Sequence, residues 1–466
     1  MRKIISFSAV WVFVLCLFPL FAFAQEGELG GLTPIKNTDR ILILAPHPDD
    51  EAVGCAGIIQ QAVKAGAALD IAYLTNGDHN QFAFIVYEKR IPLLKGEFLH
   101  MGEVRRSEAI KAMQSLGLSA DKLIFLGYPD FGTFAIFLKH WGDAPAYKSM
   151  LTRASAVPYK ENLSFDIPYK GESILEDLEW VIMRVRPTKI FVSHPADANA
   201  DHKALYLFME VALSDLEKEV PRPEVYTYLV HRVNWPLPRR YHPELPLLPA
   251  PQCTDSQVSW FKFDLTARQI EAKRAAILCY KSQTESSAFY LLSFARKNEL
   301  FSDYLPVNLK MQPSQATEAE DFSGDSGIFV DSDIAALGTL GQPVCNTDRA
   351  SYGLKGDVFH IRLIDSGKRQ HWSNIVFYLF GYSRKTPFAQ MPKIRIITSK
   401  KAVKVFDGAK ALKGTGVSWL GSPKSGVLSV PLQTLGDPDF ILTALKAYRG
   451  LLPMGATAFR KVVIKQ

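Results

Sequence analysis

Residues 45 to 51 read Ala-Pro-His-Pro-Asp-Asp-Glu and place an imidazole and three carboxylates directly after an apolar run. Charged groups beside a buried strand cost on the order of several kcal/mol unless a partner offsets that cost. A divalent metal ion is one such partner, because a catalytic zinc takes three His, Asp or Glu ligands and keeps one position for water. His47 and Asp50 lie close enough in sequence to bind one ion. Asp49, between them, is then free to hold the water and accept its proton.

A third ligand must come from a distant part of the chain, and His202 is the candidate. It ends the segment Phe191–His202, at the start of a predicted helix. Each fragment alone has a simpler interpretation: His-Pro-Asp-Asp is typical of a turn with a helix cap, and a lone His is often a surface residue. Together the two fragments favour a metal centre. Its N and O ligands suit Zn²⁺ but would also accept Fe²⁺ or Co²⁺.

Strand-like and helix-like segments alternate from Arg40 to about Tyr280, which is typical of a mostly parallel sheet with helices on both faces. The predicted strands are 41–45, 68–75, 123–126, 189–193 and 225–230, and the predicted helices are 51–65, 102–115, 174–185, 201–216 and 265–280. Ligand sites in such sheets lie beyond the carboxyl ends of the strands. His47, Asn76, Asp130 and His194 each follow a predicted strand, so we expect one shared site. The first strand-to-helix turn lacks G-x-G-x-x-G, which argues against a dinucleotide site.

Several of these segments resemble motifs of the PIG-L/LmbE-like family. The matching stretches are Ala-Pro-His-Pro-Asp-Asp-Glu at 45–51, Arg105–Glu108, Leu126–Asp130, Asp-Ala-Asn-Ala-Asp-His at 197–202, and Lys273–Gln283 with its ending Tyr-Lys-Ser-Gln. The resemblance covers roughly residues 38 to 305. It implies a Rossmann-like three-layer α/β sandwich with a mostly parallel sheet. It also implies a zinc-dependent N-acetylglucosamine deacetylase or a related amide hydrolase.

The resemblance implies a role for each matching residue. The implied Zn²⁺ ligands are His47, Asp50 and His202, with Asp49 as general base. Arg105 and Asp130 would bind substrate hydroxyls or polar head groups. Two alternatives stay open, because Arg105 could instead brace a helix and Asp130 could be an ordinary turn residue.

Position 199 departs from the family pattern. Many relatives have His-x-x-His in the second motif, whereas this chain has Asn199 in the first of those places. An amide can donate a hydrogen bond to an oxyanion but cannot deliver a proton. His194 and His231 are therefore the candidate general acids, and either could instead be a core histidine.

The C-terminal part reads as a second domain. Residues 311–327 are polar and acidic and are interpreted as a linker that follows a deacetylase domain at 25–310. Short runs of β-branched and aromatic residues then recur, which indicates a β-sandwich domain at 328–466. Its Trp372, Trp419, Tyr378 and Tyr382 could contact polysaccharide. They could equally belong to a core or to a structural lid on the first domain.

The N-terminus reads as a signal peptide at 1–24. Arg2 and Lys3 precede an apolar run, and Ala22-Phe23-Ala24 supplies the small-x-small pattern of a cleavage site. We expect export to the periplasm or the exterior after cleavage near Ala24, with no stable membrane span remaining. An uncleaved membrane anchor is the alternative. The formal net charge of +7 comes without a Lys/Arg block, so nucleic acid is not an expected partner.

The sequence thus predicts a zinc-dependent hydrolase that removes an acetyl or acyl group from an N-acylated sugar or glycoconjugate. One alternative is an amidase acting on another small amide or a thiol conjugate. A different class of protein, which binds zinc and glycan without catalysis, would keep the ligands and lose the turnover.

Overall fold

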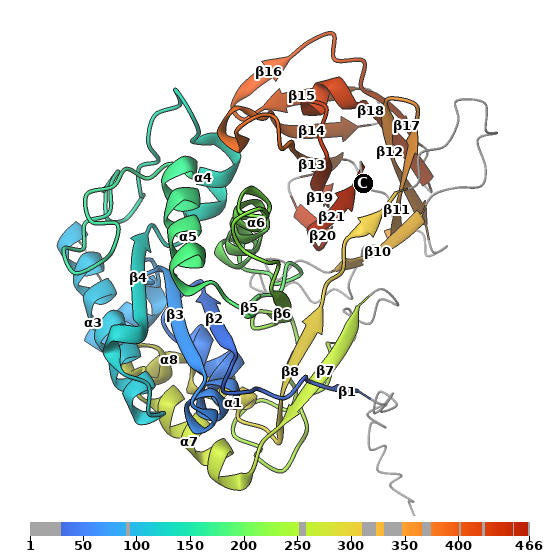
Figure 1. Ribbon diagram of the computed structural model, residues 1–466. Helices are drawn as coiled ribbons and strands as arrows, with labels where there is room; N and C mark the ends of the chain where they lie inside the picture. The colour runs from blue at the N-terminus through green and yellow to red at the C-terminus, as the bar shows by residue number, and fades with distance from the viewer. Residues whose placement is uncertain are drawn as a thin grey trace, which may run out of the picture.

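The computed structural model describes residues 29–89, 94–250, 258–309, 323–329, 347–365, 374–399, 402–421, 425–450 and 452–464. Figure 1 shows an N-terminal α/β domain with a β-rich C-terminal domain beside its helices. This confirms the predicted fold class. The predicted signal peptide lies outside the described residues.

A sheet of eight strands forms the centre of the N-terminal domain. The strands are β1 (Gly30–Gly31), β2 (Arg40–Ala45), β3 (Ala68–Thr75), β4 (Leu123–Tyr128), β5 (Lys189–Ser193), β6 (Glu224–Tyr228), β7 (Ser259–Asp264) and β8 (Asn298–Asp303). Their order is β1-β7-β8-β6-β5-β2-β3-β4, and the five strands from β6 to β4 are parallel. The chain runs from β2 outward to β4 and then returns to β5 on the other side of β2. Ligands bind at such a switch point in open parallel sheets.

Helices cover both faces of this sheet. They are α1 (Asp50–Ala65), α2 (Gln81–Glu88), α3 (Lys95–Ser115), α4 (Thr133–Lys139), α5 (Gly171–Val185), α6 (Ala200–Asp215), α7 (Ala267–Leu278) and α8 (Lys281–Leu291), with short 3-10 turns at Ala120–Lys122 and Leu292–Phe294. Helices α1 and α7 pack together on one face, and α5 packs with α6 on the other. Because both faces are covered, β2, β4 and β5 are almost wholly buried and apolar.

Helix α1 approaches the sheet unusually closely. A Cβ at Gly54 would lie 2.6 Å from the ring of Tyr228, and one at Gly57 would lie 2.3 Å from Leu265. Gly54 therefore sets how near the helix can lie to β6, and Gly57 sets how near it can lie to Leu265 and to Glu299 in β8. Cys55, between them, is fully buried and free, as the small residues around it predict.

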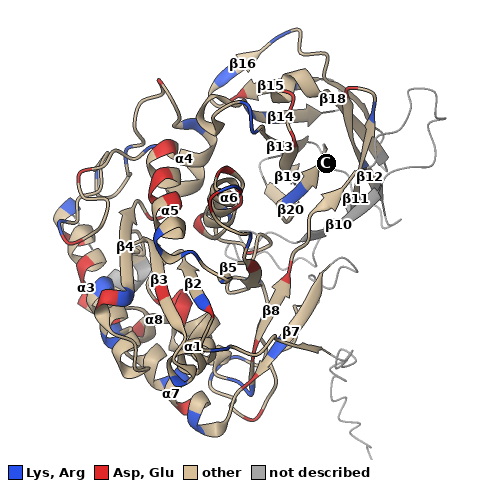
Figure 2. Ribbon diagram, viewed as in Figure 1, with Lys and Arg blue, Asp and Glu red and all other residues tan. Residues whose placement is uncertain are grey.

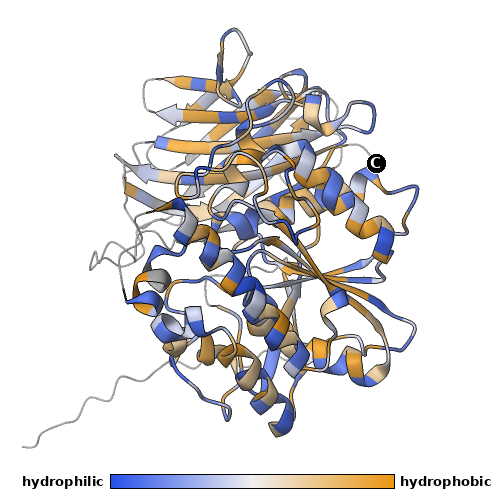
Figure 3. Ribbon diagram, turned by 90° about the vertical axis from the view of Figure 1, so that its left-hand side faces the viewer, coloured by the Kyte–Doolittle hydropathy of each residue, from blue (hydrophilic) through white to orange (hydrophobic). Residues whose placement is uncertain are grey.

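The C-terminal domain is antiparallel. Its strands, counted with the short β9 (Val307–Asn308), are β10 (Ser323–Phe329), β11 (Thr347–Lys355), β12 (Val358–Asp365), β13 (Asn374–Tyr382), β14 (Lys393–Ser399), β15 (Val403–Asp407), β16 (Lys410–Leu412), β17 (Ser418–Gly421), β18 (Ser425–Pro431), β19 (Phe440–Arg449), β20 (Leu452–Thr457) and β21 (Arg460–Val463), with 3-10 turns at Phe388–Gln390 and Leu432–Leu435. Side chains of β11, β12 and β18 share one core with those of β13, β14 and β19, so the sheet folds over as a sandwich. Figure 3 shows its strands alternating in hydropathy, as half-buried strands do.

The segment 311–327, interpreted as a linker, is described only from residue 323 onward. Strand β10 begins at Ser323, inside the segment 311–327, while residues 311–322 lie outside the described part of the chain. Strand β9 also pairs in parallel with β21, so the end of the first domain joins the second domain's sheet.

An aromatic interface joins the two domains. On α4, the ring of Phe137 lies 5.1 Å from that of Phe380 and 5.6 Å from that of Phe388, and Phe134 contacts Tyr378 and Phe459. These side chains belong to one buried cluster that continues into the core of the first domain. The β-sandwich is therefore docked on the helices by a shared core.

Polar contacts surround this aromatic interface. The Tyr382 hydroxyl donates to Asp215 at the end of α6 (2.8 Å), and the buried Lys461 ammonium donates to Glu210 (2.9 Å). Nε and Nη2 of Arg384 both donate hydrogen bonds to Oε2 of Glu217. Elsewhere Figure 2 shows acidic and basic residues distributed along the helices.

The aromatic residues considered for polysaccharide contact have other neighbours. Tyr378 and Tyr382 lie in the domain interface, and Trp419 packs on Phe377. Trp372 lies outside the described residues. Packing within and between the domains therefore accounts for the positions of Tyr378, Tyr382 and Trp419.

We expect Tyr382→Phe to lower the free energy of unfolding by about 1 kcal/mol, because it removes a partly buried hydrogen bond to a carboxylate. Urea denaturation of the full chain, followed by tryptophan fluorescence, measures the change. Tyr241→Phe is the matched control, since its hydroxyl donates to Glu271 at an exposed position. Equal effects of the two substitutions would contradict a stabilising role for the interface bond.

Within the described residues, none of the helices has the length and apolar character needed to cross a membrane.

Candidate active site

The loops that follow β2 to β6 meet around one cavity of about 490 Å³. Its lining includes six of the nine residues predicted from the sequence: His47, Asp49, Arg105, Asp130, Asn199 and His231. Asp50 and His202 lie beneath it and are almost fully buried. The parallel sheet thus brings residues more than 150 positions apart in sequence to one edge, as its topology requires.

His47, Asp50 and His202 form a compact group of metal-ligating atoms. The Oδ2 atom of Asp50 lies 3.2 Å from Nδ1 of His47 and 3.1 Å from Nε2 of His202. One ligand atom from each residue falls within 4.8 Å of the others, close enough to surround a single ion. Two nitrogens and one carboxylate oxygen, with a cavity on the open side, match the ligand set of a catalytic zinc site.

The nitrogens of His47 and His202 that face away from this group meet buried carboxylates. Nε2 of His47 lies 3.2 Å from Asp130 and 3.4 Å from Asp201, and Nδ1 of His202 lies 3.2 Å from Asp197. Metal-bound histidines characteristically place their second nitrogen against a carboxylate, which fixes the tautomer and the ring orientation. Asp130 therefore has a contact beyond the substrate-binding role implied for it.

The electrostatics of the group favour a cation. Burial alone would lower the pKa of His202, but Asp197 and Asp50 raise it to about 9. Burial would likewise lower the pKa of His47, and Asp130 raises it well above its ordinary value. Carboxylates outnumber cationic side chains here, with Arg105 as the guanidinium beside them. A divalent ion bound here would supply the positive charge that the protonated histidines would otherwise provide to these carboxylates.

Asp49 precedes α1 with a backbone φ of 126°, a conformation that costs a non-glycine residue about 1–3 kcal/mol. Its N–H donates to Glu51 Oε2 (3.1 Å), and its carboxylate lies 3.3 Å from Arg105 Nη2. Burial raises the pKa of Asp49 to about 6, while Arg105 acts in the opposite direction. These contacts hold the partly exposed Asp49 carboxylate at the cavity. It lies next to His47, Asp50 and His202 but is not one of the three candidate metal ligands.

Arg105 braces the loop that carries Asp49. Its guanidinium donates to the carbonyl oxygens of Pro48 (2.7 Å) and Gly77 (3.0 Å). A Cβ at Gly77 would lie 2.0 Å from that guanidinium, so the glycine leaves room for it. These contacts agree with the interpretation of Arg105 as a brace, and its contact with substrate stays a prediction.

The segment Lys273–Gln283 supports the site from outside. Lys273 donates to the buried Glu299 (2.7 Å), whose carboxylate also accepts the N–H of Gly57 in α1 (2.8 Å). The Tyr280 hydroxyl donates to Glu51, which in turn accepts the N–H of Asp49. Glu51 therefore supports the site through hydrogen bonds, as expected for a residue behind the ligands. Farther along, Gln283 accepts a hydrogen bond from Asn80 at the cavity wall.

The three candidates for donating a proton or a hydrogen bond occupy different places. The Asn199 side chain caps α6 by accepting the N–H of Asp201 (2.8 Å), and its amide lines the cavity. His231 also lines the cavity, and its ring lies 4.6 Å from that of His202. His194 is fully buried, stacks on Trp260 and accepts the N–H of Ala196; burial together with Arg232 lowers its pKa to about 3. The structure brings Asn199 and His231 to the cavity and places His194 behind it.

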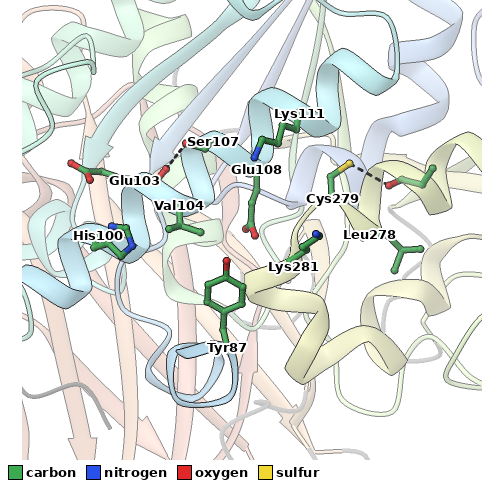
Figure 4. A pocket seen from close by; sticks show the side chains of 11 residues that line it. Tyr87, His100, Glu103, Val104, Ser107, Glu108, Lys111, Leu278, Cys279 and Lys281 are labelled. Carbon is green, nitrogen blue, oxygen red and sulfur yellow. Dashed lines mark hydrogen bonds between the residues drawn. The ribbon is translucent and has the colours of Figure 1, made fainter. Parts of the chain in front are cut away.

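A second and larger cavity, of about 640 Å³, lies between α3 and the α7–α8 corner (Figure 4). None of its lining residues was predicted as a site residue. Its buried carboxylate, Glu108, accepts the N–H and the hydroxyl of Ser282 at the start of α8. Glu108 therefore holds the two helices together.

Sequence reasoning did not single out Asp197 and Asp201. Both lie within the quoted Asp-Ala-Asn-Ala-Asp-His segment. The sequence therefore shows that they are present but not which groups their side chains contact. Asp201 accepts hydrogen bonds from the N–H groups of Phe131 and Thr133, which ties α6 to the start of α4. A buried acid beside a candidate ligand in the same motif was the available signal.

Comparison with known proteins finds one matching protein family. Residues 42–213 match the family model described as PIG-L: GlcNAc-PI de-N-acetylase. The chain therefore carries a PIG-L family domain, and this match supports a hydrolase of the deacetylase type. The matched range includes all the predicted site residues except His231. No curated protein matches the chain.

The solved structures that match this chain are distant from it in sequence. The conserved protein TT1542 from Thermus thermophilus is 21% identical with a TM-score of 0.31, and the match covers 53% of this chain and 81% of that one. N,N'-diacetylchitobiose deacetylase from Pyrococcus horikoshii is 17% identical with a TM-score of 0.35, over 57% and 84%. GalB, the 4-carboxy-2-hydroxymuconate hydratase from Pseudomonas putida, is 18% identical with a TM-score of 0.35, over 60% and 100%.

Proposed function

We propose that this protein is a metal-dependent hydrolase that removes an acetyl or other acyl group from an N-acylated sugar or glycoconjugate. The observation that carries the proposal is the grouping of His47, Asp50 and His202 beneath a cavity where Asp49 presents a carboxylate. The PIG-L family match supports the deacetylase type of reaction.

The proposed ion is Zn²⁺, held by His47, Asp50 and His202. The ligand set fits, and the carboxylates behind both histidines give each ring the orientation that metal binding needs. When bound there, the ion supplies Lewis acidity, which promotes the loss of a proton from water and polarises a carbonyl group.

The chain's own residues have distinct proposed roles. Asp49 accepts the proton of the attacking water, whose oxygen adds to the amide carbonyl carbon. The Asn199 amide donates a hydrogen bond to the carbonyl oxygen as negative charge develops there. His231 gives a proton to the amide nitrogen as the carbon–nitrogen bond breaks. The products are the free amine and the carboxylate of the acyl group.

The cavity wall gives the proposed substrate both polar and apolar contacts. Phe131 and Met150 line the cavity and remain 55% and 59% exposed, which is unusual for large apolar side chains. His79, Gln81 and Gln283 line other parts of it. A sugar offers an apolar ring face together with hydroxyl groups, so an N-acylated sugar suits this mixture. Because Arg105 and Asp130 already contact protein groups, their proposed substrate contacts would use their remaining hydrogen-bonding capacity.

The function is tested with metal analysis and a substrate panel. The purified full chain is loaded with zinc and assayed for amine release from N-acetylglucosamine, N,N'-diacetylchitobiose, longer N-acyl sugars, a thiol-conjugate amide and a simple acetanilide. We expect bound metal, with the fastest amine release from an N-acylated sugar. Preference for the thiol conjugate would favour the amidase alternative. Bound metal without amine release from any amide would favour a non-catalytic binding protein.

Export is proposed on the N-terminal sequence alone. Cleavage near Ala24 would deliver the chain to the periplasm or the exterior. N-terminal sequencing of the protein recovered from a producing cell identifies the first residue of the mature chain.

A further inference from the structure

Asp197 joins two loops of the active site. Its Oδ2 atom accepts the N–H groups of Val230 (3.0 Å) and His231 (2.8 Å), and its Oδ1 atom accepts the N–H of Asn199 (2.9 Å). The side chain is fully buried. One carboxylate therefore fixes the loop that follows β5 against the loop that follows β6.

The same two oxygens face two histidines. Oδ2 of Asp197 lies 3.2 Å from Nδ1 of His202, and Oδ1 lies 3.3 Å from Nδ1 of His231. Both rings thus turn Nδ1 toward Asp197, which leaves their Nε2 atoms for other partners. Nε2 of His202 lies 3.1 Å from Asp50, in the group of metal-ligating atoms. The ring of His231 lines the cavity, with its side chain 37% exposed.

We propose that Asp197 is a positioning residue shared by a metal ligand and a proton donor. It holds His202 in the tautomer whose Nε2 lone pair binds the metal, and it holds His231 with Nε2 toward the substrate. The first role follows the general behaviour of carboxylates behind metal-bound histidines. The second resembles the Asp of a Ser-His-Asp triad, which fixes the imidazole tautomer without itself taking the proton. This inference rests on the proposed function and adds the residue that couples its two halves.

The arrangement also accounts for Asn199. Its backbone N–H binds Asp197 and its side chain caps α6, so both groups stabilise the loop. An asparagine at this place cannot supply a proton, whereas the carboxylate two residues earlier reaches His231 on the neighbouring loop. The chain thus has its proton donor on the loop after β6, with the supporting acid still inside the Asp-Ala-Asn-Ala-Asp-His segment.

Two substitutions in the full-length protein separate the two roles. Asp197→Asn keeps the size and one acceptor oxygen but removes the charge and places N–H donors against the histidines. We expect it to weaken zinc binding by about 10- to 100-fold, measured by competition with a chelator. His231→Ala removes a partly exposed side chain that is outside the ligand group, so zinc affinity should be unchanged. With the best amide of the substrate panel, His231→Ala should lower kcat at least about 10-fold with little change in KM.

The double variant tests the coupling. If Asp197 acts on turnover through His231, then adding His231→Ala to Asp197→Asn should lower kcat by much less than His231→Ala does alone. Independent, multiplicative losses would overturn the shared role, and so would unchanged zinc affinity in Asp197→Asn. Glu108→Gln is the matched control, because Glu108 is also a buried acid that accepts a backbone N–H, but none of its hydrogen bonds involves a histidine. It should leave zinc affinity unchanged.

The two readouts also separate this inference from the proposed function. Zinc affinity needs no substrate, so the His202 half can be tested even if the wild-type protein hydrolyses none of the amides. If Asp197→Asn fails to fold, His231→Ala still decides the other half. Unchanged kcat in His231→Ala would overturn the assignment of His231 and with it the coupling.

Discussion

Asp49→Asn should lower kcat by about 10²- to 10⁴-fold while the protein still binds zinc, because a positioned general base typically contributes that factor. Asparagine has nearly the same shape as aspartate and tolerates unusual backbone angles, so the φ of 126° at this position can be kept. The N–H of Asp49 donates to Glu51, and its carbonyl oxygen accepts the N–H of Val53; neither hydrogen bond depends on the side-chain charge. The loss should therefore appear in turnover and not in folding. Steady-state kinetics and metal analysis of the same sample measure both.

A matched control separates lost chemistry from a disturbed backbone. Asp166 is also an aspartate with positive φ (64°), but it is exposed and does not line the active-site cavity. Asp166→Asn should leave kcat unchanged. If Asp49→Asn keeps wild-type turnover, Asp49 is not the base. If it loses its zinc, the carboxylate contributes to metal binding, and the ligand group must be redrawn.

The strands that position the site could be predicted because their signals are local. The apolar run before His47 and the one before His194 form β2 and β5, and parallel strands bring their carboxyl ends to one edge. The ligand candidates His47, Asp50 and His202 follow from that topology and from residue type. The distances between them, with Asp50 between the two imidazole rings, result from side-chain packing. The spacing of residues in the sequence cannot predict that packing.

Features that depend on contacts between distant segments were not predictable. Strands β7 and β8 mix charged with apolar residues, so they lack the apolar run that identifies a buried strand. They lie at the antiparallel end of the sheet, where β8 pairs with β6 and β7 pairs with β8. Helix α8 is polar and lacks a clear apolar face. Its start is held by hydrogen bonds from Ser282 to Glu108 and from Tyr280 to Glu51, and these two acids belong to other helices. Tyr378 and Tyr382 could be read equally well as glycan contacts or as core, because sequence does not show which face of a strand meets another domain.

The largest expected loss of stability comes from Lys273→Met. Lys273 and Glu299 form an ion pair with 0% and 1% side-chain exposure and a separation of 2.7 Å. Removing one partner of such a pair leaves the other charge buried without compensation, which typically costs about 3–5 kcal/mol. We expect a loss of that size in the free energy of unfolding, measured by urea denaturation of the full chain.

A second substitution should recover most of that loss. In the double variant Lys273→Met with Glu299→Gln, neither charge of this pair remains. The glutamine oxygen can still accept the N–H of Gly57. Lys122→Met, which breaks an exposed pair with Asp121, is the matched control and should change stability little. If the single and double variants were equally unstable, the cost would come from lost packing of the lysine chain and not from charge. Because Glu299 also holds α1 below the loop of Asp49, the single variant should lose zinc affinity as well, and the double variant should regain it.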